Sequence, residues 1–449
     1  MKLTFVYYCV FIQKRQTHAY AAIAFSIKKR WKISLFMTKK LLKNEFSSSH
    51  IISNLCELIV GFGIVHKISS DDRDYSAEDF PETAENAVKC FSYLHILLKE
   101  LELMEHSYKR HFIINVLLLC ATHSRNHHWS NCSSISSSKD FVNDLLQHTV
   151  FDNLSKLLCA EDFLPTIFKG MLKKLRPSLL KDTWMHYPSS CYVFHWLLCH
   201  VKHPYLVEYL PDVFPPPFMF VSYHAVPQKV IGIQCFNHLL DNIPPTLIEL
   251  DGKEDAIYHT LFPLTYSKDI PIVEILYPCL LKLPMINMKK KKLVYWDEKD
   301  KILDRLLFVV DCEDNLELKR LFFSHIKDFV DCSQPFNHLK RMMPILKRNL
   351  IENPFSDIKC QITALKIIRS VIMSCWPRMK NYCFDILVAI LDLQQQNSTK
   401  NIDEINELSE ECLILLKNSC SEHFESLTSK YIESSDVPGV DLLKKVLKQ

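Results

Sequence analysis

The chain has 449 residues, of which 54 are basic and 51 acidic, so the formal net charge is only +3. Hydrophobic residues make up 48% and charged residues 23%, which is typical of a folded globular protein and excludes a largely disordered chain. The total charge gives no indication of nucleic acid or an anionic membrane as a partner, although it leaves a basic face on one side open.

Glycine is scarce. The chain holds six glycines, where a chain of average composition and this length holds about 30. Glycine permits positive φ and close backbone approach, so its scarcity argues against phosphate-binding loops and tight hairpins. Gly61 and Gly63 form a G-x-G without a third glycine, inside an apolar run that predicts a helix. A Rossmann or P-loop enzyme is therefore excluded on composition and motif.

Residues 1–40 differ from the rest of the chain. An apolar run from Leu3 to Ile12 has the length of a signal-peptide core and is too short to span a bilayer. No small-x-small cleavage pattern closely follows it, and the segment ends in the basic stretch "SIKKRWKISLFMTKK". We interpret it as a basic, weakly structured leader, with a signal peptide as the alternative.

The 17 cysteines are spread along the chain without any C-x-x-C pair. Most lie inside apolar runs such as "WLLCHV", where a free cysteine behaves as a small buried hydrophobic residue. An odd number of cysteines in a large protein favours a reducing compartment over a disulfide scaffold.

From residue 41 onward the apolar residues recur at helical spacing. Residues 41–200 are predicted to form an N-terminal helical region with polar loops near 69–82 and 123–139. In residues 201–449 the predicted helices are 228–242, 253–264, 271–283, 297–310, 315–330, 337–353, 358–375, 379–393, 402–417, 422–432 and 441–448.

Four of these predicted helices are comparable and are interpreted as the first helix of a repeat unit; they begin near Gln228, Pro271, Asn315 and Ile358. Their spacing of roughly 43 to 44 residues is typical of HEAT and armadillo repeats, in which each unit is a helix pair that cannot bury its apolar face alone. The pattern predicts an all-α, HEAT/armadillo-like α-solenoid of antiparallel helix pairs. Separate helical bundles are the alternative.

The segment "CATHSRNHHWSNC" holds the one candidate metal site, formed by Cys120, His123, His127 or His128, and Cys132. Thiolate and imidazole at short spacing are zinc ligands. Their spacing matches no standard zinc finger, and Cys120 ends an apolar helix, so a histidine-rich polar loop is favoured.

No G-x-S-x-G or H-E-x-x-H motif occurs, and no glycine adjoins a candidate cysteine nucleophile. We therefore expect neither an enzyme nor a cofactor. The four lysines Lys289–Lys292 are interpreted as a solvated loop; a nuclear-import or phosphate-binding patch is the alternative.

Two proline-containing segments suggest corners between helices. Pro377 in "SCWPRMKNYC" cannot continue the preceding helix, so Trp376 is predicted to fill the core at a corner, with Arg378 in solvent or paired with an acidic group of a partner. In "FPPPF" the prolines are interpreted as a rigid connector, and a polyproline docking site is the alternative.

Three segments together resemble the central signature of the Tel-two-interacting protein two family: "HPYLVEYLPDVFPPPF", "KVIGIQCFNHLLDNIPPTLI" and "GKEDAIYHTLFPLTYSKDIPIVEILYPCLLKL". The later "WPRM" also resembles the family, and the likeness covers residues 140–435. The stretch "VSYHAVPQK" departs from the acidic pair usual after the proline run. Thirteen matching positions are interpreted as partner-binding or structural: His203, Pro204, Pro215, Pro216, Pro217, Lys229, Gly232, His238, Asn242, Tyr258, Trp376, Pro377 and Arg378.

The resemblance implies a non-enzymatic scaffold subunit of the TTT co-chaperone complex. Its implied partners are the two larger TTT subunits and, indirectly, the ninety-kilodalton heat-shock chaperone and the phosphatidylinositol-3-kinase-related kinases that it helps to mature. The implied location is the cytoplasm, with the nucleus as a second location, and no membrane or direct nucleic-acid contact is implied. The alternative function is a helical-repeat adaptor for nuclear transport or nucleic acid that uses Lys289–Lys292.

Overall fold

The computed structural model describes residues 49–68, 75–249, 252–286, 296–351, 357–397, 402–433 and 440–448. Within these ranges every regular element is a helix, which confirms the predicted all-α fold. The leader at 1–40 and Lys289–Lys292 lie outside the described residues. None of the described helices has the length and apolar character needed to cross a bilayer.

The chain divides into two compact units, 1–176 with 186–189 and 177–185 with 190–449. Helix α9 (Ser190–Cys199) belongs to the second unit, where it packs against α12 (Val226–Asn242).

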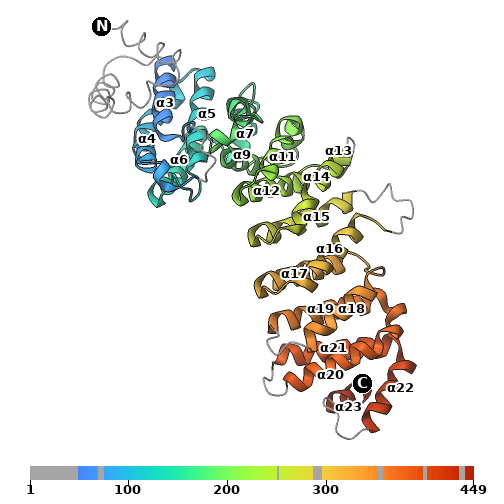
Figure 1. The fold of residues 1–449 in the computed structure, drawn as a ribbon. Coiled ribbons are helices and arrows are strands. Elements are labelled where there is room, and N and C mark those ends of the chain that lie inside the picture. The colour runs from blue at the N-terminus through green and yellow to red at the C-terminus, as the bar shows by residue number, and fades with distance from the viewer. Residues whose placement is uncertain are drawn as a thin grey trace, which may run out of the picture. The chain divides into compact units, whose positions relative to one another are not determined.

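The first unit packs its helices around α5 (Figure 1). Helices α3, α6 and α8 all contact α5, and α4 packs against α3 and α6. Nearly every residue of α5 from Phe112 to Thr122 is buried, as expected for a helix covered on all sides. The helices of this unit are α3 (Ser49–Gly63), α4 (Thr83–Leu98), α5 (His106–Thr122), α6 (Cys132–Thr149), α7 (Leu154–Cys159) and α8 (Ile167–Leu175).

The serine-rich stretch after Asn131 is helical, although its composition predicted a polar loop as far as residue 139. The Asn131 side chain accepts a hydrogen bond from the Ser134 backbone N–H at 2.8 Å and so caps α6. Further along, Val150 adopts a left-handed conformation with φ 60° and ends α6. Capping by Asn153 and Thr166 then starts α7 and α8.

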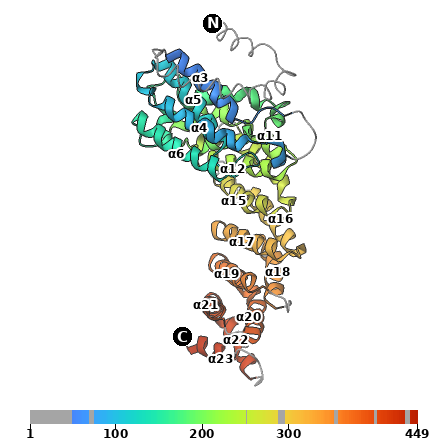
Figure 2. The same ribbon diagram turned by 90° about the vertical axis from the view of Figure 1, so that its left-hand side faces the viewer.

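The second unit is an array of two helical rows, shown in Figures 1 and 2. In the first row α12, α15, α17, α19 and α21 each contact the next, and in the second row α16, α18, α20 and α22 do the same. The remaining helices of this unit are α10 (Leu210–Val213), α11 (Pro216–Ser222), α13 (Pro245–Glu249), α14 (Lys253–Leu261), α15 (Ile270–Ile286), α16 (Glu298–Cys312), α17 (Leu316–Cys332), α18 (Leu339–Ile351), α19 (Ile358–Cys375), α20 (Cys383–Asn397), α21 (Asp403–Ser419), α22 (Ser421–Glu433) and α23 (Val440–Lys448).

The first-row helices begin at 226, 270, 316, 358 and 403, so the predicted repeat spacing is present. They are the second helix of each pair, not the first as the sequence suggested, because they pair with the helix that precedes them, as in α16 with α17 and α18 with α19. The sequence spacing of the helices is the same whether a helix pairs with the one before it or the one after it. The contacts between helices are therefore needed to decide which two form a repeat. This unit is an α-solenoid of helix pairs.

Gly232 sets the distance between α11 and α12. A Cβ at this position would lie 2.6 Å from Val221 Cγ2, 2.8 Å from the Val221 backbone N and 3.0 Å from the Pro217 carbonyl oxygen. Two of these three atoms belong to backbone, which cannot turn aside as a side chain can. The helices therefore approach each other closely only because this residue has no side chain.

We expect Gly232→Ala to destabilise the protein by about 1–3 kcal/mol, because the added methyl group overpacks a backbone contact. Gly61→Ala is the matched control, since a Cβ there meets nothing within 4 Å and lies in α3. The control should be neutral or slightly stabilising by helix propensity. Thermal unfolding of both variants checks this, and equal melting temperatures would contradict the close-packing argument.

Candidate interaction surface

The signature residues around 203–242 form a packed corner between α9, α11 and α12. The His203–Pro204 peptide bond is cis. His238 in α12 donates from Nε2 to the Val201 carbonyl oxygen at 2.8 Å, and burial lowers the pKa of its imidazole. Asn242 donates from Nδ2 to the His238 carbonyl oxygen at 2.8 Å. These polar side chains satisfy backbone groups of the fold.

The three prolines of "FPPPF" do not form a connector. Pro216 and Pro217 are the buried first turn of α11, where a missing N–H costs no helical hydrogen bond. Phe218 in the same helix packs on Phe236 of α12, with ring centroids 4.8 Å apart. This stretch is therefore helix and core, and a polyproline docking peptide does not form here.

Tyr258 and Lys229 complete this part of the signature. Tyr258 in α14 is 8% exposed, stacks on Phe262 at 5.2 Å, and has its pKa raised to about 12, first by burial and then by the Glu298 carboxylate. Lys229 lies half-buried in the first turns of α12. The signature of residues 203–258 thus marks how the first repeats pack.

The C-terminal signature is different, because its tryptophan is not in the core. Trp376 is 60% exposed, which shows that the predicted core position is wrong. Pro377 does form the predicted corner, since α19 ends at Cys375 and a 3-10 helix, η7 (Trp376–Asn381), follows. The buried residues at this end of α19 are Val371, Cys375 and Met379, which follow one another at intervals of four residues. Trp376 is not part of this stripe of buried residues, and the sequence pattern could have shown this.

Arg378 binds the preceding repeat. Its Nη1 donates to the Phe336 carbonyl oxygen at 2.9 Å, and its guanidinium lies 5.0 Å from the centroid of the Phe336 ring. The arginine is exposed, and it also makes these contacts within the chain. It connects the turn before α20 to the turn before α18.

The candidate zinc ligands are not brought together. Among the residues that the structure describes, no three His, Cys, Asp or Glu side chains are grouped to hold a metal ion. His123 is buried and donates from Nε2 to the Gly63 carbonyl oxygen at 2.8 Å, while Ser130 Oγ lies 3.2 Å from its Nδ1. Cys120 is in the core, and Cys132 is exposed in the first turn of α6. His123, directly after α5, thus connects the end of that helix to the end of α3.

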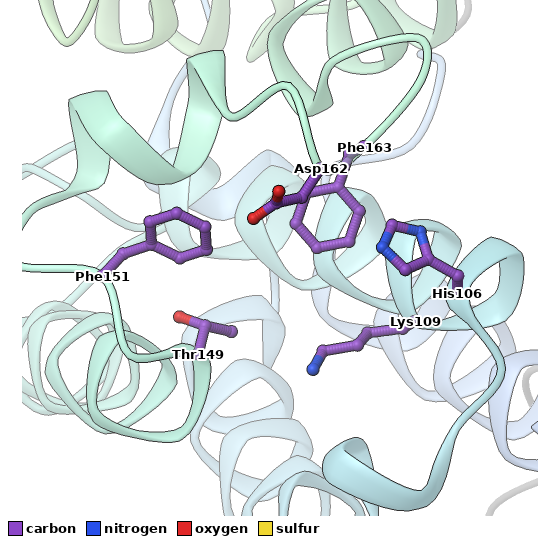
Figure 3. A pocket seen from close by; sticks show the side chains of 6 residues that line it. All are labelled: His106, Lys109, Thr149, Phe151, Asp162 and Phe163. Carbon is purple, nitrogen blue, oxygen red and sulfur yellow. The ribbon is translucent and has the colours of Figure 1, made fainter.

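A small open pocket of about 290 Å³ lies in the first unit (Figure 3). His106 and Lys109, from the start of α5, lie on one side of the pocket. Thr149, the last residue of α6, and Phe151, just after it, lie on the other side, and Asp162 and Phe163 lie between the two groups. The His106 and Phe163 rings contact at 4.9 Å, and Thr149 Oγ1 donates to the Leu145 carbonyl oxygen. The Thr149 hydroxyl thus bonds within its own helix.

Ion pairs connect successive repeats within both rows of the second unit. The pairs of both rows join residues 35 to 42 positions apart. In the second row they are Asp304–Arg341, Asp311–Arg348 and Lys347–Asp385. In the same row the His338 Nε2 lies 2.8 Å from Asp300 Oδ1. In the first row the pairs are Asp241–Lys282, Arg320–Asp357, Lys366–Glu404, Arg369–Glu411 and Glu410–Lys445.

Each exposed ion pair adds only about 0–1 kcal/mol. As a set, however, they fix how far each helix is shifted along its neighbour. Sequence analysis missed them, because the pairing offset becomes visible only when the repeats are aligned.

The Arg320–Asp357 pair has the most favourable geometry. Arg320 donates from Nε and Nη2 to the two carboxylate oxygens at 2.7 and 2.6 Å, and Asp357 also accepts from the Cys360 backbone N–H at 3.1 Å. The hydrogen bond from Arg320 is the main reason that the pKa of Asp357 lies below its usual range. One carboxylate thus caps α19 and holds it against α17.

Comparison with known proteins now adds to these observations. No family model matches the chain. TELO2-interacting protein 2 of mouse is 24% identical over 404 residues, which cover 84% of this chain and 78% of the mouse protein. The rat protein of the same name is 24% identical over 80% of this chain and 75% of its own length. The human protein is 24% identical over 74% and 68%.

The chain is thus similar to TELO2-interacting protein 2 over most of its length. In this chain the signature at residues 203–258 packs within the fold, while Trp376 stands at the surface. A solved structure of an engineered protein aligns over 88% of this chain and 98% of its own at 9% identity with a TM-score of 0.45, a likeness too loose to define the fold.

The buried His123 should make the first unit sensitive to acid. Burial lowers the pKa of His123 from 6.5 to about 4, so the unfolded chain takes up this proton first as the pH falls. Stability should therefore decrease between pH 6.5 and pH 4, by about 1.4 kcal/mol per pH unit for one such group. His123→Gln keeps a donor for Gly63 and removes the titration. Melting temperatures across this range should fall less steeply in the variant, and an unchanged slope would contradict the assignment.

Two substitutions separate the two roles of Asp357. Asp357→Asn keeps an oxygen that can cap α19 but removes the charge, so we expect a loss of up to about 1 kcal/mol. Asp357→Ala removes the cap as well and should cost about 1 kcal/mol more. Denaturant unfolding at pH 7 and at pH 3 checks this. Because the folded-state pKa is lowered, the charge contribution is present above the ordinary value near 3.8 and disappears as the pH falls below it.

Proposed function

We propose that this protein is a non-enzymatic scaffold that binds the TELO2 protein of its organism. The observation that carries the proposal is the relationship over most of the chain to proteins whose name states an interaction with TELO2. The relationship includes both units and is not confined to one repeat, so it concerns the whole architecture.

The form of the second unit supports a binding role. A solenoid presents long continuous surfaces to other proteins, and the ion pairs between repeats hold those surfaces in one register. The polar groups of the signature corner are used inside the fold, and the pocket of the first unit has no nucleophile–base pair. These features suit recognition by shape and do not provide a reactive centre.

We further propose that the protein acts within the TTT complex, together with the two larger subunits. There it would support the chaperone-dependent maturation of phosphatidylinositol-3-kinase-related kinases, in the cytoplasm and also in the nucleus. This finer role follows from the resemblance of the signature segments and is a separate step from binding TELO2.

Co-expression tests the two steps in order. The tagged chain is produced together with the TELO2 protein of the same organism, and a stoichiometric complex on size-exclusion chromatography is the expected result. Depletion of the chain in its own cells should then lower the steady-state level of the kinases, without lowering their messenger RNA. Absence of any complex with TELO2 would overturn the proposal, while a complex without an effect on the kinases would overturn the finer role alone.

A further inference from the structure

Three aromatic residues occupy matching turns of the second unit. Trp296, Phe336 and Trp376 are spaced 40 residues apart. Each lies in the turn that leads from a first-row helix to the next second-row helix, before α16, α18 and α20 respectively. We call these three residues the turn aromatics.

The first two turn aromatics are covered by the following repeat. The His338 ring contacts Trp296 with centroids 4.8 Å apart, and the Arg378 guanidinium lies 5.0 Å from the Phe336 centroid. Each covering side chain comes 42 residues after the ring it covers and two residues after the next turn aromatic. A nitrogen-containing side chain, imidazole or guanidinium, thus caps each ring in the same way.

The covering side chains are themselves held in place. His338 is buried, and its Nε2 lies 2.8 Å from Asp300 Oδ1 in α16. Arg378 donates to the Phe336 carbonyl oxygen as well as facing the ring. The cap on each ring is therefore a built contact between repeats and not a loose side chain on the surface.

Trp376 ends the series without a cap. Among the described residues it has no ring or cation contact, and it is 60% exposed, against 38% for Trp296. The reason lies in the next turn: only Cys420 separates α21 from α22, so this turn is too short to present a covering side chain. The residue 42 positions after Trp376 is Asn418, inside α21.

We infer that Trp376 receives a cationic side chain, an arginine above all, from the partner protein that binds this edge of the solenoid. The inference rests on the proposed function and names the chemistry of one contact within it. A guanidinium stacks flat on an indole face and is weakly hydrated, so it can approach Trp376 although Lys380 lies in the same turn. Tryptophan and arginine are also both enriched in binding hot spots, and hot spots tend to face each other across an interface.

Three variants of the full-length chain test the contact, in complex with the co-expressed TELO2 protein and with the whole TTT assembly. Trp376→Leu keeps an apolar side chain but removes the ring, and we expect about tenfold weaker binding. Trp376→Phe keeps an aromatic face and should retain part of the affinity. Phe308→Leu is the matched control, because this 47% exposed ring is already contacted by Arg305 and Arg341. It should bind as the wild type does.

The outcomes separate the inference from the proposed function. Failure of the wild-type chain to bind either assembly overturns both. Wild-type binding that Trp376→Leu leaves unchanged overturns the inference alone. Equal losses in the Phe and Leu variants assign the contact to the indole itself and overturn the cationic partner. If Trp376→Leu instead abolishes self-association of the chain, a second copy occupies the site and the inference is likewise wrong. Since Trp376 is exposed, the variants should melt within about 2 °C of the wild type, as expected for surface substitutions.

Discussion

The structure of the second unit depends on one constraint: no helix pair can bury its apolar face by itself. Helix α19 buries residues from Cys360 to Cys375 on more than one side, and it can do so only because α17 and α21 lie against it. The same dependence passes from each repeat to the next. A protein built in this way owes its stability to the contacts between neighbouring repeats, and its surface is the sum of their edges.

Two kinds of contact then determine how the repeats are aligned. At the start of the array, the lack of a side chain at Gly232 allows α11 and α12 to approach each other closely. Further along, charged side chains join each helix to its successor in the same row, and the Arg320–Asp357 pair combines this with a helix cap. Apolar burial drives the association, but it is not directional. The charged and capped contacts supply the direction, so that the array has a defined register.

Contacts inside the fold also account for several of the polar side chains in the chain. Two histidines considered in the sequence analysis, His123 and His238, donate hydrogen bonds to backbone carbonyl oxygens. Burial lowers the pKa of both, which keeps them neutral at physiological pH. We therefore propose that partners bind at the edges of the repeats, where the last of the turn aromatics is an exposed tryptophan.

Much of the fold was determined by the sequence alone. Helical periodicity, the repeat spacing and local signals such as Asp357 before α19 and Pro377 after it are properties of neighbouring residues, and the helix predicted at 358–375 has the observed bounds. Tertiary structure decided the rest. Whether Trp376 is buried, which helices form a pair, and which carboxylate meets which arginine all depend on residues about 40 positions apart. Such contacts arise only when one repeat packs on the next, because local sequence determines a helix but not the neighbour that covers it.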